Sequence, residues 1–186
     1  MKNKKEIFCG IIVIGNEILS GRTQDTNTST LSIWLNSLGI KVQEVRIIPD
    51  VEEEIIKTVN ELRKKYNYIF TTGGIGPTHD DITASSISKA FNITYGPHKE
   101  AMSILEKYYK PGEFNEGRQK MAWMPTKANL ILNPTSGAPG FNVENVFCLP
   151  GVPSILKSML GGISNKLVGG KPIISNTINL RTVESE

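Results

Sequence analysis

The sequence predicts an α/β fold in which parallel strands form a central sheet with helices on both faces. Three observations lead to this prediction. Continuous apolar runs such as residues 7–14 are typical of strands that are covered on both sides. Helical patterns alternate with these runs, which implies parallel pairing through crossover connections. The third run ends in a glycine-rich loop, Thr71-Thr-Gly-Gly-Ile-Gly-Pro-Thr-His-Asp-Asp-Ile-Thr83, which precedes another helix.

The first half of the chain alternates regularly between strand and helix patterns. We expect strands at residues 7–14, 41–48 and 68–70, and helices at residues 26–38, 51–65 and 82–91. Asp25 or Thr26 is suited to cap the first helix, and Gly39 to end it.

Asp50 stands at the start of the helix expected at residues 51–65. The pattern Asp50-x-x-Glu53 resembles a capping box, and the apolar stripe of the helix begins at Val51. Helix capping alone therefore accounts for Asp50 in its local sequence.

The second half of the chain is punctuated more densely by glycine and proline. We expect a short extended segment at 93–95, a helix at 97–109 with Pro97 in its first turn, and a short helix at 114–124. Closely spaced turn residues predict short antiparallel strands within 130–147. Then follow an apolar run at 146–149, a helix at 153–167 and a last strand at 173–180.

Composition narrows the class of protein. The chain has 186 residues, a size typical of one domain, and its net charge of +3 is too small for a protein with a concentrated basic face. We therefore expect no nucleic acid partner. No stretch approaches the roughly 20 apolar residues of a membrane span. Cys9 and Cys148 lie in apolar runs without a Cys-x-x-Cys spacing, which predicts buried free thiols in a cytoplasmic protein.

Four loops are expected to meet at one edge of the sheet. In parallel sheets, ligands bind outside the carboxyl ends of the strands. Applied to this chain, the rule gathers residues 15–21, 49–50, 73–81 and 149–153. This convergence favours a ligand site over a turn whose aspartates only cap the next helix.

The chemistry of these loops suits phosphate and a divalent cation. The glycine loop lacks the Gly-Lys-Ser/Thr ending of a P-loop and the Gly-x-Gly-x-x-Gly spacing of a dinucleotide fold, so phosphate would rest on backbone amides. Asp80 and Asp81 offer the hard oxygen ligands that Mg²⁺ or Mn²⁺ prefers. Glu17 lies in a turn after a strand, where it either binds the ligand or is simply exposed.

The loop Thr71–Thr83 closely resembles the signature of the molybdopterin-binding (MoCF, MogA/MoaB-like) family. The Asp80-Asp81 doublet is similar to that of its competence/damage-inducible protein A (CinA) branch. The segments Gly15-Asn-Glu-Ile-Leu-Ser-Gly21, Asp25-Thr-Asn27, Ser136-Gly-Ala-Pro-Gly-Phe141 and Leu149-Pro-Gly-Val-Pro153 also match that branch.

The resemblance implies a three-layer α/β/α sandwich that forms homo-oligomers, either dimers or trimers. It implies one such domain over residues 1–181, with a truncated or disordered tail at 182–186. In adenylyl-transferring relatives two aspartates are functional, and they match Asp50 and Asp81. In the CinA branch the associated activity is metal-dependent hydrolysis of ADP-ribose or FAD.

These expectations define a candidate site. Asp50 and Asp81 are expected to be catalytic, and Asp80 and Asp81 to hold a divalent cation (Mg²⁺, Mn²⁺ or Co²⁺). The residues expected to bind a nucleotide or pterin ligand are Gly15, Glu17, Thr72, Gly73, Gly74, Gly76, Pro77, Thr78, Ser136, Gly137, Pro150 and Gly151.

Two alternatives stay open. Adenylyl transfer to molybdopterin is disfavoured by the acid doublet, which stands where such relatives have a basic residue before the closing aspartate. The second alternative is that the chain is a nucleotide- or pterin-binding module without catalytic activity.

Overall fold

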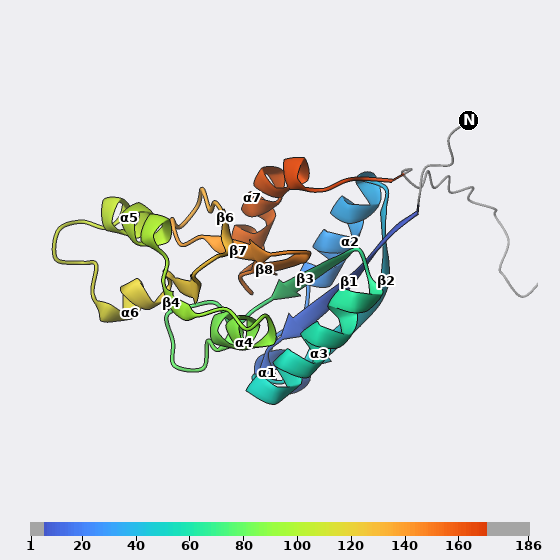
Figure 1. The fold of residues 1–186 in the computed structure, drawn as a ribbon, viewed down its shortest axis with the longest axis horizontal. Helices are drawn as coiled ribbons and strands as arrows, with labels where there is room; N and C mark the ends of the chain where they lie inside the picture. Colours follow the sequence, from blue (N-terminus) through green and yellow to red (C-terminus); the bar gives the residue numbers. More distant parts are fainter. Residues whose placement is uncertain (1–5, 171–186) are drawn as a thin grey trace, which may run out of the picture.

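The structure is a computed structural model that describes residues 6–170. Its first half contains β1 (Ile7–Ile14), α1 (Asn16–Leu19), α2 (Asn27–Ser37), β2 (Ile40–Ile48), α3 (Glu52–Lys65), β3 (Tyr68–Thr72) and α4 (Thr83–Ala90). Its second half contains β4 (Tyr95–Pro97), α5 (Lys99–Tyr108), α6 (Glu116–Lys120), β5 (Trp123–Pro125), β6 (Asn129–Ile131), β7 (Gly140–Val143), β8 (Val146–Leu149), α7 (Pro153–Ile163) and a 3₁₀ turn (Ser164–Lys166). Figure 1 shows these elements.

The main sheet has the strand order β2-β1-β3-β8-β7-β6. The first four strands are parallel, whereas β7 runs antiparallel to both β8 and β6. The register pairs Ile14 with Ile48, Val13 with Thr72, and Thr72 with Leu149. All four parallel strands therefore end at the same edge of the sheet.

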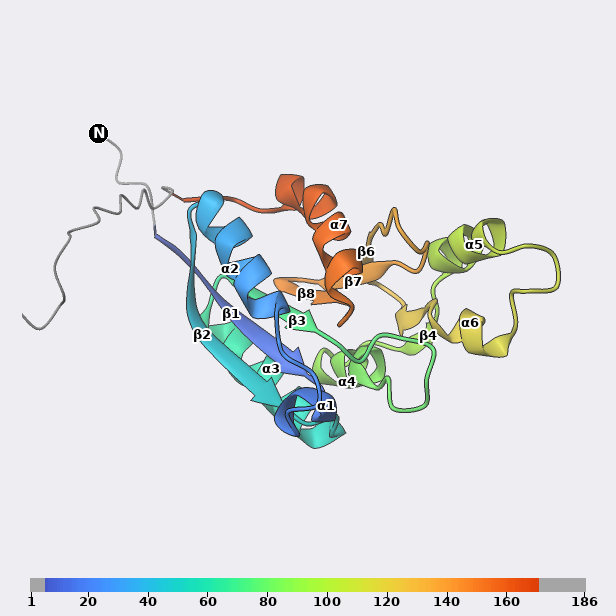
Figure 2. The ribbon, with the colours of Figure 1, turned by 180° about the vertical axis from the view of Figure 1, so that it is seen from behind.

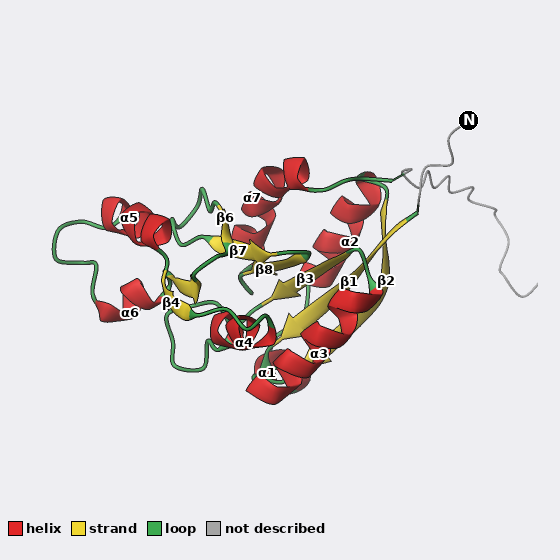
Figure 3. Ribbon diagram, viewed as in Figure 1, coloured by secondary structure: helices red, strands yellow, loops and turns green. Residues whose placement is uncertain are grey.

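Helices cover both faces of this sheet, as the coloring by secondary structure shows (Figure 3). Along β1, Ile12 and Ile14 join a core cluster with α3 and α4, and the alternate residues Ile11 and Val13 join a second cluster with α2 and α7. Figure 2 shows α2 and α7 from the opposite side. The α/β fold with a mostly parallel central sheet and helices on both sides is confirmed.

A smaller lobe extends beyond the sheet at the end opposite β2 (Figure 1). It contains α5, α6 and an antiparallel ribbon in which β4 pairs with β5. Tyr95 and Trp123 from the two strands of this ribbon pack with ring centroids 5.7 Å apart.

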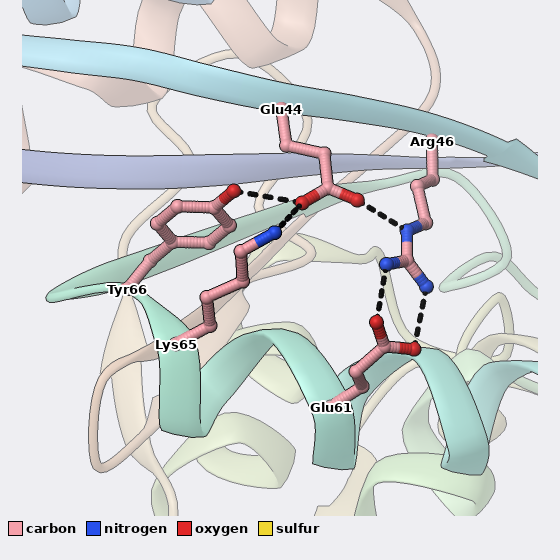
Figure 4. A network of polar contacts seen from close by, with 5 residues as sticks. All are labelled: Glu44, Arg46, Glu61, Lys65 and Tyr66. Atoms are coloured by element: carbon pink, nitrogen blue, oxygen red, sulfur yellow. Dashed lines mark hydrogen bonds and ion pairs between the residues drawn. The ribbon is translucent and has the colours of Figure 1, made fainter.

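A network of charged side chains holds α3 against the edge strand β2 (Figure 4). Glu44 accepts hydrogen bonds from Lys65 Nζ at 2.8 Å, Tyr66 Oη at 2.7 Å and Arg46 Nε at 2.7 Å. Arg46 also binds Glu61 through two parallel hydrogen bonds of 2.8 and 2.6 Å. These donors lower the pKa of Glu44 to about 2, with Lys65 contributing most.

The capping box expected at Asp50 is wrong. Val51 is the N-cap residue of α3, and no side chain caps the helix. Val51 is also 41% exposed instead of lying in the core, because the stripe that packs on the sheet begins one turn later at Ile55. Acids in the first turn of α3 and basic residues in its last turn still match the helix dipole.

Other expected boundaries shift by a few residues. Asn16–Leu19 forms a short helix in place of a turn. Pro97 belongs to β4, so α5 begins after His98, whose Nδ1 accepts a hydrogen bond from Ala101 N at 3.4 Å. The helix expected at 114–124 shortens to α6, because Trp123 pairs in β5. Gly39 has the positive φ of 74° expected at a helix end. The strand expected at 173–180 lies outside the described residues.

Both cysteines are buried free thiols, as expected. Burial raises the pKa of Cys9 and of Cys148 to about 12. Within residues 6–170, no helix combines the length and the apolar character that crossing a membrane requires.

Candidate functional site

The loops that follow the parallel strands touch one another at the carboxyl edge of the sheet. Gly15 N donates to Ile48 O at 3.1 Å, which joins the loop after β1 to the end of β2. Gly73 N donates to Leu149 O at 3.1 Å, which joins the loop after β3 to the end of β8. A Cβ on Gly151 would lie 3.4 Å from Gly73 Cα. The four loops therefore form one surface.

The glycine loop depends on two residues with positive φ. Gly73 has φ of 97° and Gly74 has φ of 67°. A Cβ on Gly73 would come within 3.0 Å of the backbone oxygen of Ile14, and one on Gly74 would come equally close to Thr83 Oγ1. Thr83 Oγ1 in turn donates to Gly73 O at 3.0 Å. Only glycine satisfies both the backbone conformation and the space at these positions.

Residues of this loop border a cavity of about 420 Å³, lined by Glu17, Thr23, residues 73–76, Asp81 and residues 150–153. Among the described residues, the amides of Gly74, Ile75 and Gly76 have no hydrogen-bond acceptor. The N-terminus of α7 also meets this cavity at Val152 and Pro153, and no side chain caps it. Free amides and an uncapped helix N-terminus are the groups that bind anions in proteins.

Asp81 closes the loop by folding back onto it. Its Oδ2 accepts hydrogen bonds from Thr78 N at 2.8 Å and from Thr78 Oγ1 at 2.5 Å. Asp80 Oδ1 lies 2.5 Å from the same hydroxyl, which lowers the pKa of Asp80. Lys120 Nζ from α6 donates to Thr78 O, so the smaller lobe contacts the outer part of the loop.

Asp50 reaches across to the loop after β1. Its Oδ2 accepts a hydrogen bond from Asn16 N at 2.8 Å. Burial raises the pKa of Asp50, and the negative charges of Glu17, Asp80 and Asp81 raise it further, against the lowering effect of Asn16 N. Asp50 therefore belongs to an acidic group that includes both members of the aspartate doublet.

The divalent cation expected at Asp80 and Asp81 stays a prediction. Among residues 6–170, no group of three or more His, Cys, Asp or Glu side chains forms a ready-made metal cage. Mg²⁺ usually binds through one or two carboxylates plus substrate phosphates and water, so such a cage is not required. Asp80 and Asp81 each use one oxygen in the hydrogen bonds to Thr78 described above, which leaves the other oxygen of each for a cation.

The structure brings together most of the expected site residues. Gly15, Thr72, Pro150 and Gly151 lie at the strand ends, and Pro77 and Thr78 form the outer turn of the glycine loop. Ser136 and Gly137 lie in the loop between β6 and β7. There Asn133 Nδ2 donates to Ser136 Oγ at 2.6 Å, and a Cβ on Gly137 would clash with the Tyr108 ring. Neither residue lines the cavities at the glycine loop, and their binding role stays a prediction.

Thr23 and Asn27 were not among the expected site residues, although both line cavities at the carboxyl edge. Asn27 Nδ2 donates to Gly151 O at 2.8 Å and so connects the start of α2 to the turn before α7. In the sequence, only the family resemblance pointed to the segment Asp25-Thr-Asn27. Its contact with Gly151 could not be predicted, because it forms only in the folded chain.

Comparisons with known proteins agree with this picture. Residues 10–168 match the family described as "Probable molybdopterin binding domain". A protein of Saccharolobus islandicus is 37% identical over 172 residues, which cover 89% of this chain and 65% of that protein. A protein of Pyrobaculum calidifontis is 38% identical over 164 residues, which cover 85% of this chain and 63% of that protein. The chain thus spans just under two thirds of the length of these relatives.

Three solved structures share the fold. The protein CinA of Thermoplasma acidophilum, described as having unknown function, superposes with a TM-score of 0.80 and 29% identity over 86% of this chain and 96% of its own. MoaB of Thermus thermophilus gives a TM-score of 0.59 and 18% identity over 87% of this chain and 91% of its own. MoaB of Pyrococcus furiosus, a tungsten cofactor synthesizing protein, gives a TM-score of 0.57 and 23% identity over 87% of this chain and 92% of its own. The last two likenesses show the fold alone.

Proposed function

We propose a function from the premise that this chain belongs to the family of probable molybdopterin binding domains and is CinA-like within it. The family indicates a small-molecule ligand of the pterin or nucleotide class. Our proposal is that the carboxyl-edge site hydrolyses a nucleotide diphosphate, such as ADP-ribose or FAD, with a divalent cation.

One observation carries this proposal: residues with unpaired backbone amides and residues with carboxylates line one cavity. Residues 74–76 and the uncapped N-terminus of α7 border a cavity of about 420 Å³, which is large enough for part of a nucleotide. Glu17 and Asp81 line the same cavity. Asp50 is close enough that both of these acids raise its pKa.

Each group has a role in the proposed reaction. The diphosphate rests on the glycine-loop amides and on the Gly151 turn. Asp50, whose pKa is raised by burial and by its acidic neighbours, accepts a proton from the attacking water. The water oxygen bonds to one phosphorus as the bridging P–O bond breaks, and two monophosphates leave. A bound divalent cation would neutralise charge on the phosphates and make the water more acidic.

The test is release of AMP from ADP-ribose or FAD. The purified chain is incubated with either compound and Mg²⁺, Mn²⁺ or Co²⁺, or with a chelator, and AMP is measured by chromatography. We expect AMP only with a cation, and a fall in rate of about 100-fold or more in Asp81→Asn. Glu106→Gln, which removes an exposed acid of α5 outside the site, is the matched control and should leave the rate unchanged.

Three results would redirect the proposal. No AMP with any cation contradicts hydrolysis. Tight nucleotide binding without turnover, unchanged in Asp81→Ala, favours a binding module without catalysis. Consumption of ATP only when molybdopterin is present favours adenylyl transfer, the second candidate, which the family's description supports.

We also propose that the chain forms a homo-oligomer, either a dimer or a trimer. Size-exclusion chromatography with light scattering tests this, and a monomer at micromolar concentration contradicts it.

A further inference from the structure

The smaller lobe brings one basic side chain to the glycine loop. Lys120, the last residue of α6, reaches the outer turn of the loop, where its Nζ donates to Thr78 O. Lys120 also lines a second cavity, of about 10 Å³, together with Ile75, Gly76 and Asp81. The same three loop residues line the cavity of about 420 Å³. Lys120 is therefore a neighbour of the surface on which the proposed ligand rests.

The charge of Lys120 is not paired with a carboxylate. Its Nζ carries three N–H donors, and the contact with Thr78 O uses one of them. Asp80 and Asp81 both bind the Thr78 hydroxyl instead, and no ion pair within residues 6–170 includes Lys120. The hydrogen bond from Thr78 lowers the pKa of Asp80 most, and the charge of Lys120 lowers it further. The ammonium group thus lies near the aspartate doublet with donors to spare.

This positive charge stands out against the other residues of the site. Among the residues that line the three cavities at the carboxyl edge, Lys120 is the only one with a Lys, Arg or His side chain, whereas Glu17, Asp25 and Asp81 are acidic. A diphosphate would add negative charge to this acidic surface, which is unfavourable unless cations compensate it. A lysine ammonium is a common partner of phosphate in proteins, where it acts as a point charge.

The contact with Thr78 O is easily exchanged for one with a phosphate. A carbonyl oxygen is a neutral acceptor, and hydrogen bonds between two charged groups are stronger. The long flexible stem of lysine allows Nζ to move. The cavity of about 10 Å³ has room for about one water, so the phosphate must lie on the loop itself. Thr78 follows Gly76 by two residues, which span at most about 7 Å of chain, so the ammonium lies a short distance beyond the free amides.

We propose that Lys120 binds the second phosphate of a nucleotide diphosphate whose first phosphate rests on the glycine-loop amides. Its Nζ exchanges Thr78 O for a phosphate oxygen, and the smaller lobe thereby becomes part of the site. Lys120 is then a specificity-determining residue that favours diphosphates over monophosphates. This inference rests on the proposed function, since it requires a nucleotide diphosphate at the glycine loop.

Calorimetric titration of the unmodified protein with α,β-methylene-ADP and with AMP is the first test. The methylene bridge replaces the oxygen whose bond to phosphorus would break, so Mg²⁺ can be present without turnover. We expect the diphosphate analogue to bind about tenfold or more tightly than AMP, both with Mg²⁺ and with a chelator. Equal affinity for the two ligands overturns the proposal, because the second phosphate then gains no contact.

Two variants assign this preference to Lys120. Lys120→Met keeps the length of the side chain and removes its charge. Lys120→Gln also removes the charge but retains an N–H donor for Thr78 O. Each variant should bind the analogue about tenfold or more weakly than the unmodified protein and bind AMP with unchanged affinity. An equal loss of affinity for both ligands indicates a structural role and overturns the proposal, as does an unchanged preference in either folded variant.

Lys127→Met is the matched control. Lys127 is an exposed lysine in the turn between β5 and β6, and it lines none of the three cavities. This variant should keep the preference for the diphosphate. If Lys127→Met loses the preference to the same extent as Lys120→Met, the effect comes from the overall charge of the protein, and the contact with Lys120 is rejected.

The proposed function and this inference fail in different ways. Release of AMP from ADP-ribose together with an unchanged preference in the Lys120 variants retains hydrolysis and rejects the role of Lys120. Binding of the analogue that depends on Lys120, without AMP release under any condition, rejects hydrolysis and retains the diphosphate contact. Absence of both AMP release and analogue binding rejects the two together.

Discussion

Replacing Gly73 by alanine tests whether the glycine loop requires glycine for the reasons given above. Two costs add at this position. The φ of 97° places an alanine in a left-handed conformation, at a cost of about 1–2 kcal/mol. The new Cβ would also come within 3.0 Å of Ile14 O, a backbone atom at the end of the central strand β1, and overpacking of this kind costs about 1–3 kcal/mol.

The sum for Gly73→Ala is a loss of about 2–5 kcal/mol in the free energy of unfolding. A chain of this size loses about 2–4 °C in Tm for each kcal/mol, so the expected fall is about 4–20 °C. Thermal unfolding followed by circular dichroism and urea titration measure the two quantities independently.

Gly21→Ala is the matched control. Gly21 has a similar positive φ of 73°, but no atom lies within 4 Å of the position of its Cβ. It should therefore lose only the conformational cost, about 1–2 kcal/mol. If Gly73→Ala is no more destabilising than Gly21→Ala, the close approach between the glycine loop and β1 is not a constraint, and the argument is refuted.

Three further predictions concern ionisable groups. Asp50→Asn should raise the free energy of unfolding at pH 7, since charge on Asp50 is unfavourable in the folded state. This gain in stability should vanish below pH 3.8, where the carboxyl of Asp50 is protonated in both the folded and the unfolded protein. If urea titrations at pH 7 show no gain for Asp50→Asn, the raised pKa of Asp50 is contradicted. Glu44→Gln should cost about 1 kcal/mol at pH 7, because the network is partly exposed to solvent. The pKa of Glu44 is lowered in the folded protein, so the stabilisation that Glu44 provides is present above pH 4.5 and is lost as the pH falls toward about 2. If the difference in unfolding free energy between Glu44→Gln and the unmodified protein does not change with pH, the stabilisation is not ionic. Cys9 and Cys148 should not react with a thiol reagent such as dithionitrobenzoate in the native protein and should both react in urea, and rapid native labelling would show that they are accessible.

The sequence predicted those elements whose pattern is long enough to be read locally. The strand at residues 7–14 and the helix that contains Ile55, Val59 and Leu62 each repeat their apolar spacing several times, and the structure confirms both. Short elements gave weaker signals. The ribbon of β4 and β5 has three residues in each strand, so no periodicity could distinguish it from the neighbouring helices.

The position of the site was predictable from topology, whereas individual contacts were not. The rule for parallel sheets brought four loops together because it depends only on strand order. The role of Asp50 could not be settled by its neighbours in sequence, since the local pattern allowed a cap and the actual donor is Asn16 on another loop. Asn27 escaped prediction for the same reason, because its partner Gly151 lies at the other end of the domain's sequence.

The pairing of β3 with β8 has a consequence for the order of folding. These strands are neighbours in the sheet, yet the whole of α4, the smaller lobe and β6–β7 separates them along the chain. Closing so long a loop is slow, whereas β1, β2 and β3 are joined by short crossovers. We expect the half of the site that carries Asp50 to form early in folding. The hydrogen bond from Gly73 to Leu149 would then form last, so that the glycine loop takes its final shape only when the second half of the domain has docked.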